Sequence, residues 1–133
     1  MHCSVIIKKI LELTIFFSDL YFRYIKEEEE LYLNSKEEEI SFNLIANSGD
    51  GRSFAFSSLE HAKRGDFEQS DILMKKSDEA IATAHKSQTE LLVATAKGES
   101  ISLNVLLIHA QDHLMTSMLA NELIKEIIYL YKK

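Results

Sequence analysis

The chain of 133 residues has the length of one domain and enough apolar residues, 46%, to bury a core. It contains no proline and only four glycines, a composition that favours uninterrupted helices over turn-rich β architecture. Its net charge of −6 argues against nucleic acid as a partner, because phosphate binding needs a basic face. A single cysteine, Cys3, excludes an internal disulfide and is consistent with a reducing compartment.

Residues 1–36 are predicted to form a helical, acidic N-terminal extension. Charged residues interrupt its apolar run too often for a membrane-spanning helix, and no signal peptide is recognisable, so we expect a cytoplasmic chain without a membrane span. The acidic run Glu27–Glu30 is either a linker or a solvated helix face. An apolar stripe with helical period suits either a helix packed on its own core or one docked on a membrane surface or a partner, and its residues are Ile6, Ile10, Leu13, Phe17, Leu20 and Tyr24.

Residues 37–133 are predicted to form one domain of three helices. The first runs from about residue 36 to residue 63, with Ser35 as a plausible N-cap. Arg64-Gly65-Asp66 is typical of a helix stop, a left-handed glycine and a new N-cap, so the second helix is expected at 67–97. The third starts near Ser102 and continues to the C-terminus. Short connections make neighbouring helices antiparallel, which predicts an all-α, up-down-up three-helix bundle.

Small residues in the first two helices predict close packing. Gly49 and Gly51 weaken the middle of the first helix and indicate a kink or a close helix contact. Gln88 is expected inside, with His85 on its flank, and either bonds across helices or orients a reactive group. The expected seam of the second helix follows a heptad pattern and comprises Phe67, Met74, Ile81, Gln88 and Thr95, alternating with Ser70, Ser77, Ala84 and Leu91.

The third helix carries three ionisable groups, His109, Asp112 and His113, in an apolar neighbourhood. Such groups destabilise a fold unless they are paired, metal-bound or neutral. Their spacing of three and four residues lets all three approach one another. His109 has three interpretations: a structural histidine bonded to Asp112 or a carbonyl, a zinc ligand with Asp112 and His113, or a nucleophile that forms a covalent intermediate.

The third helix is also apolar over too much of its circumference for an isolated bundle, so its spare face needs another chain to cover it. If identical third helices run parallel about a symmetry axis, Asp112 faces its own copies. Carboxylates placed in this way cannot all be ionised without a cation. Either a divalent metal lies on the axis or some carboxyls stay protonated, and an oxygen-only shell suits Mg²⁺ with waters better than zinc.

Two segments, His109–Thr116 and Ala84–Leu92, together resemble the enzyme IIA component of the lactose/cellobiose (chitobiose) sugar phosphotransferase system. Three further pieces resemble that family in the same order, namely Asn47–Ser53, Lys63–Phe67 and Glu126–Lys132. The resemblance extends from about residue 38 to residue 132, and residues 1–36 match nothing recognisable.

The resemblance implies a homotrimer of three-helix subunits, with the third helices around the axis of a nine-helix bundle. By the same match, His109 is the phosphorylated histidine and carries the phosphoryl group on Nε2. The match also implies that the three copies of Asp112 share one divalent metal ion on the axis, for which the oxygen-only shell favours Mg²⁺. Gln111, His113, Gln88 and His85 match further family positions and are expected to support the site.

The implied reaction is phosphoryl relay: His109 accepts the group from the phosphocarrier HPr and passes it to a cysteine of the cognate IIB component, which serves the membrane component IIC. The expected sugar is a β-linked disaccharide of the cellobiose/chitobiose or lactose type, and Ala110 and the run from Met115 to Ala120 resemble the first of these branches more than the second. Two alternatives stay open on the residues alone. One is a zinc-dependent enzyme that uses His109, Asp112 and His113, and the other is a non-catalytic helical oligomer or adaptor.

Overall fold

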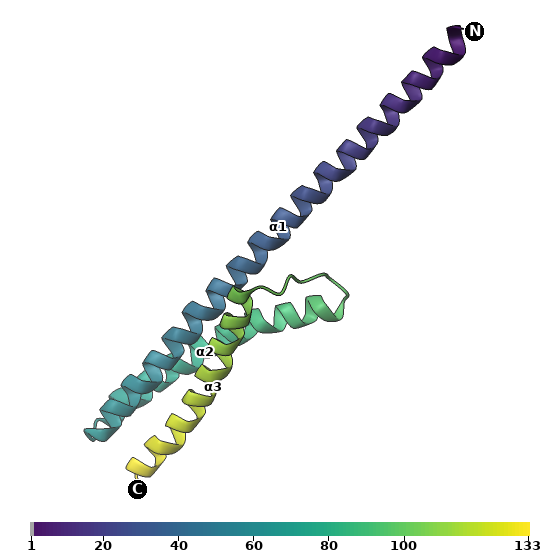
Figure 1. The fold of residues 1–133 in the computed structure, drawn as a ribbon. Helices are drawn as coiled ribbons and strands as arrows, with labels where there is room; N and C mark the ends of the chain where they lie inside the picture. The colour runs from purple at the N-terminus through teal and green to yellow at the C-terminus, as the bar shows by residue number, and fades with distance from the viewer. Residues whose placement is uncertain (1) are drawn as a thin grey trace. The chain divides into compact units, whose positions relative to one another are not determined.

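The computed structural model contains three helices, α1 (His2–Lys63), α2 (Phe67–Ala96) and α3 (Val105–Tyr131) (Figure 1). The structure describes the backbone of residues 2–133 and the side chains of residues 15, 17–29 and 36–133. No strand occurs in this described backbone, so the all-α prediction is confirmed. The chain divides into two units, residues 1–36 and 37–133.

In the first unit, α1 runs without interruption through the acidic segment Glu27–Glu30, which is therefore helical and not a linker. The predicted N-cap at Ser35 is wrong, because the helix continues through it; Leu33 before it and Lys36 and Glu37 after it are good helix formers, and no glycine or proline intervenes. No helix in the described part of the chain is long and apolar enough to cross a bilayer. Of the predicted stripe, Ile6, Ile10 and Leu13 lie outside the described side chains, whereas Phe17, Leu20 and Tyr24 are exposed.

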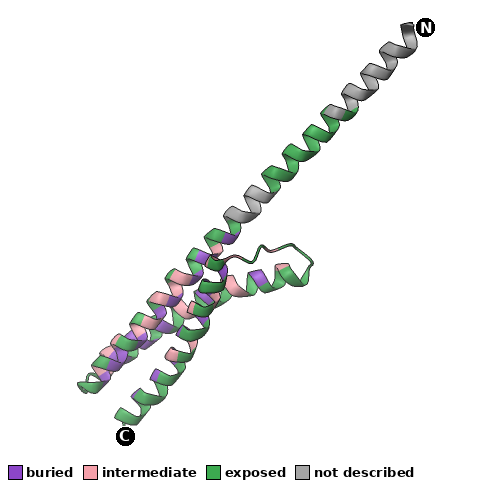
Figure 2. Cartoon of the chain, viewed as in Figure 1, coloured by how far each residue is buried: buried purple, intermediate pink, exposed green. Residues whose placement is uncertain are grey.

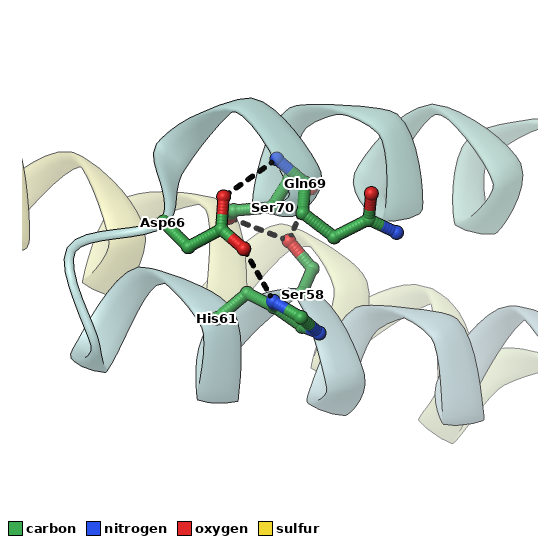
Figure 3. A network of polar contacts seen from close by, with 5 residues as sticks. All are labelled: Ser58, His61, Asp66, Gln69 and Ser70. Atoms are coloured by element: carbon green, nitrogen blue, oxygen red, sulfur yellow. Dashed lines mark hydrogen bonds and ion pairs between the residues drawn. The ribbon is translucent and has the colours of Figure 1, made fainter.

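The turn between α1 and α2 agrees with its prediction. Gly65 has a φ of +80°, a left-handed conformation that favours glycine, and Asp66 is the N-cap of α2. One Asp66 carboxylate oxygen accepts the Gln69 backbone N–H at 3.2 Å, and the other lies 3.0 Å from His61 Nδ1 (Figure 3). The contact with His61, followed by the backbone hydrogen bond, lowers the pKa of the Asp66 carboxyl. Both atoms of this carboxylate therefore stabilise the turn.

Small side chains let α1 and α2 approach closely. The Ser58 hydroxyl donates to the Ser70 carbonyl at 2.7 Å and lies 3.0 Å from the Ser70 hydroxyl, and both serines are fully buried (Figure 3). A Cβ added at Gly51 would lie 2.7 Å from the Ile81 side chain, so the predicted close helix contact is confirmed there. The seam of α2 is buried largely as predicted, although Thr95 is exposed and Phe67, Ile81 and Gln88 are only partly buried.

The connection from α2 to α3 differs slightly from its prediction. Gly98, with a φ of +83°, follows the end of α2, but α3 begins at Val105 and not near Ser102. The Ser102 backbone N–H donates to Glu37 Oε1 at 2.7 Å, which holds residue 102 outside the helix. Asn104 is the N-cap instead, and its side chain accepts the Leu107 N–H at 2.8 Å.

Within residues 37–133, α2 runs back along α1 and α3 returns in the direction of α1, which gives the predicted up-down-up bundle (Figure 1). Buried residues follow one side of each helix, and the outer sides are exposed (Figure 2). The core has two clusters, one of Leu44, Ala84, Leu91, Leu107, Ala110 and Leu114 and the other of Ala55, Leu59, Ala62, Met74, Ile124 and Ile128.

Candidate functional site

His109 and His113 lie one turn apart on α3 and their rings are in contact. The ring centroids are 5.3 Å apart and the planes meet at 67°, an edge-to-face arrangement. His109 is exposed, while His113 is partly buried towards α1. Among the described residues His109 has no side-chain hydrogen bond, so the interpretation of His109 as a bonded structural histidine finds no support in one chain. Its ring is open to a partner molecule.

The His113 ring lies against α1. Its Nε2 is 3.5 Å from a guanidinium nitrogen of Arg52, and its Nδ1 is buried without a hydrogen-bond partner in the described part of the chain. A Cβ added at Gly49 would lie 3.8 Å from His113 Cε1, so the α1 backbone passes directly beside the ring. Burial, then the Arg52 cation and then His109 lower the pKa of His113, and Asp112 opposes them. His113 is therefore kept neutral near neutral pH.

Arg52 is the site residue that sequence reasoning missed. It stands within the segment Asn47–Ser53, which resembles the family, but no spacing links it to the third helix, because 61 residues separate it from His113. The only local signal is its place three residues after Gly49, on the same side of a helix. The structure adds this cation to the predicted cluster.

The two predicted glutamines meet across α2 and α3. Gln88 is partly buried, and its Nε2 donates to Gln111 Oε1 at 2.6 Å and lies 3.9 Å from Met115 Sδ. Gln88 thus bonds across helices, which is the first of the two roles considered for it. His85 is exposed, and its side chain is not part of any polar contact that the structure describes in this cluster.

Asp112 lies on the outer face of α3, surrounded by exposed apolar side chains. Ile108 and Met115, one turn to either side, are 60% and 56% exposed. This face, which we call the α3 outer face, also includes Val105, Leu119, Leu123, Ile127 and Leu130, all exposed. So much exposed apolar surface on one helix marks an interaction site, as the sequence predicted.

Metal binding by one chain finds little support. Across the described residues there is no group of three or more His, Cys, Asp or Glu side chains placed to hold a metal ion. His109, Asp112 and His113 are thus near one another in sequence without forming a three-ligand set, which weighs against the zinc alternative. Asp112 offers one exposed carboxylate per chain, a hard oxygen donor of the kind that suits Mg²⁺ if other copies complete the shell.

The chain is similar to known proteins over the whole bundle. The family model described as the lactose/cellobiose-specific IIA subunit of the PTS system matches residues 39–132. A PTS lactose-specific EIIA component from Staphylococcus epidermidis is 45% identical over 94 residues, which cover 71% of this chain and 90% of the relative. An N,N'-diacetylchitobiose-specific EIIA component from Escherichia coli is 47% identical over 96 residues, covering 72% of this chain and 83% of the relative.

A solved structure agrees. The PTS cellobiose-specific enzyme IIA from Bacillus anthracis superposes with a TM-score of 0.70 at 51% identity, covering 72% of this chain and 88% of that one. The chain therefore belongs to the lactose/cellobiose-specific IIA subunits of the phosphotransferase system, which carry phosphoryl groups on a histidine.

Proposed function

We propose that His109 is the phosphoryl-carrying histidine, and that it receives the group from HPr and passes it to a cysteine of the cognate IIB component. The observation that supports this role is an exposed imidazole without a hydrogen-bond partner among the described residues, seated against a neutral neighbour, His113. The solution structure of an IIA(Chitobiose)–HPr complex, similar to this chain at TM-score 0.64 and 44% identity, supports HPr as the donor.

The chemistry needs a neutral ring nitrogen with access to the donor. The lone pair of His109 Nε2 attacks phosphorus, and a new N–P bond forms as the N–P bond to the HPr histidine breaks. In the second step a cysteine thiolate of IIB attacks, and an S–P bond forms as the His109 N–P bond breaks. Catalysis is then largely a matter of positioning and of stabilising charge on the transferring oxygens.

Incubation with enzyme I, HPr and phosphoenolpyruvate tests the proposal. We expect an acid-labile, base-stable phosphoprotein that disappears in His109→Gln. A phosphoprotein that persists in this variant would refute the assignment. Stoichiometric zinc that is lost in both His109→Gln and His113→Gln would favour the metalloenzyme, and wild-type complementation of sugar uptake by His109→Ala would favour an adaptor.

We further propose a homotrimer in which the α3 outer faces meet around an axis and the three Asp112 carboxylates share one divalent ion, Mg²⁺ by its preference for oxygen ligands. The exposed apolar face supports the assembly, and the single exposed carboxylate within it supports the shared ion. The ion would neutralise carboxylates that otherwise repel one another.

Sedimentation is expected to give the mass of three chains, and a stable monomer would refute this assembly. Removal of metal with EDTA should destabilise the wild-type trimer, since an ion bound only by the folded assembly adds about 2.7 kcal/mol when its free concentration is about a hundred times its Kd. Asp112→Asn should form a trimer that EDTA does not affect. Equal sensitivity of the two proteins would place any metal elsewhere.

The proposed pathway is uptake of a β-linked disaccharide of the cellobiose/chitobiose or lactose type, with the cytoplasm as the location and the IIC component as the membrane partner. Relatives named for lactose and for chitobiose, at 45% and 47% identity, support the sugar class without separating its members. Residues 37–133 are proposed as the IIA domain and residues 1–36 as an extension. A strain that lacks the gene is grown on each disaccharide, with and without a plasmid copy of the gene. The sugar on which growth requires the plasmid copy is the one transported.

A further inference from the structure

The contact between Arg52 and His113 bears on which nitrogen of the imidazole carries the proton. A guanidinium has five N–H donors and no acceptor, so a neutral His113 ring facing it at 3.5 Å must accept through the Nε2 lone pair. The ring proton is then on Nδ1. The position of Arg52 thus favours one of the two neutral tautomers of His113.

This tautomer is not the one that the immediate surroundings of Nδ1 would choose. Nδ1 is buried and has no acceptor among the described residues, so its proton gains nothing from being there. An unpartnered buried polar group in a native structure calls for an explanation, and functional sites are where such groups are tolerated. Here the explanation lies on the opposite side of the ring, where α1 presents the cation.

The same ring is confined on its other sides. The α1 backbone at Gly49 approaches Cε1 closely enough for an added Cβ to lie at 3.8 Å. The His109 ring lies against it edge to face, with centroids 5.3 Å apart. Because the two rings are in contact, a rotation of His113 displaces His109, whose ring has no hydrogen bond of its own in the described structure.

We propose that Arg52 is a positioning residue for phosphoryl transfer: it donates to Nε2 of His113, fixes the tautomer and orientation of that ring, and through it sets the orientation of the His109 imidazole. This inference rests on the proposed role of His109. The contact that the structure describes for the Arg52 side chain is with His113 and not with His109. Its effect reaches His109 through the intervening ring, so it should alter the rate of transfer more than the binding of the donor.

The test compares three variants of the full chain. Arg52→Met keeps the length of the side chain and removes the donors, Arg52→Lys keeps a donor and the charge, and Arg64→Gln, at the exposed α1–α2 turn, is the matched control. Long-range ¹H–¹⁵N spectra of the unphosphorylated protein report the His113 tautomer. Transfer from phosphorylated HPr, measured as kcat and KM, reports the consequence for His109.

We expect wild-type His113 to be in the Nδ1–H tautomer, and the Nε2–H tautomer to become populated in Arg52→Met. In that variant kcat should fall by about tenfold to a hundredfold with little change in KM, since small displacements of a reacting group cost this much. Arg52→Lys should recover the wild-type tautomer and part of the rate. Arg64→Gln should match the wild type in both measurements.

An Nε2–H tautomer in the wild type, or a tautomer that does not change in Arg52→Met, would overturn the inference. A raised KM with an unchanged kcat would also overturn it and would assign Arg52 to docking of HPr. The spectra need no phosphoryl transfer, so they decide the tautomer even if His109→Gln shows that another residue carries the group. Failure of the carrier assignment and failure of this inference are therefore distinguishable.

Discussion

Two histidines of this chain, His61 and His113, are each held by a charged side chain, and they differ in what the contact leaves unsatisfied. His61 Nδ1 meets a carboxylate, Asp66, at 3.0 Å, and the same carboxylate also caps α2. His113 meets a cation, Arg52, at 3.5 Å, and its other nitrogen is buried without a partner in the described structure. The first arrangement satisfies its polar groups and stabilises a turn. The second leaves the His113 Nδ1 unsatisfied beside the exposed His109. An unsatisfied buried polar group of this kind is typical of a functional site.

The largest expected difference between His61 and His113 is in the rate of phosphoryl transfer. His113→Ala removes the ring that supports His109, and transfer of phosphoryl from HPr should slow by about a hundredfold, the cost of a poorly oriented reacting group. His61→Ala is the matched control and should leave the rate unchanged, because His61 lies at the α1–α2 turn. Rapid-quench measurement of phosphoprotein formation checks both. A similar slowing in the two variants would remove the distinction drawn between the turn and the site.

The next effect is one of stability. In the turn region, Ser58→Ala removes a donor to Ser70, leaves the buried Ser70 hydroxyl without its partner and should lower the free energy of unfolding by about 1–3 kcal/mol. Ser117→Ala is the control, because the Ser117 hydroxyl is buried without a partner among the described residues and its loss should be neutral or stabilising. Urea unfolding at one fixed protein concentration measures both. Equal losses would mean that the Ser58 hydrogen bonds contribute nothing of their own.

The smallest effect is a pH dependence confined to the turn. Because the folded-state pKa of Asp66 is lowered, its stabilising contribution is present above the unfolded value near 3.8 and is lost as the pH falls through the lower folded value. Asp66→Asn keeps an N-capping acceptor but cannot titrate. Thermal unfolding between pH 5 and pH 3 should therefore show a slightly steeper fall of Tm for the wild type. Parallel curves would show that the His61 contact does not persist in solution.

The turn between α1 and α2 could be predicted from residues close together in the sequence. The start of α3 could not, because it depends on a contact between residues far apart in the sequence. Gly65 and Asp66 act within a few residues, so the end of α1 and the N-cap of α2 followed from the sequence. The start of α3 was placed too early because Ser102 is held by Glu37, 65 residues away. Ser35 looked like a cap by residue type alone, but the strong helix formers around it carry α1 through.

The site residues likewise fall into those that spacing within one helix predicted and those that depend on packing between helices. Helical spacing along one element predicted that His109 and His113 would meet, and the heptad of α2 placed Gln88 where it reaches Gln111. Arg52 comes from another helix, and only the packing of α1 on α3 brings it to His113. The resemblance to a family carried the assignment of His109, because spacing alone left three interpretations open.

The bond between Glu37 and Ser102 also fixes where the chain can be shortened. Glu37 is buried, it is the first residue of the second unit, and it anchors the connection between α2 and α3. A version that starts at residue 36 retains this anchor, whereas one that starts only two residues later lacks the Glu37 carboxylate that accepts the Ser102 N–H. A truncation that removes the N-terminal extension therefore has a margin of a single residue. If the cut also removes Glu37, the resulting loss of stability would be wrongly attributed to the missing extension.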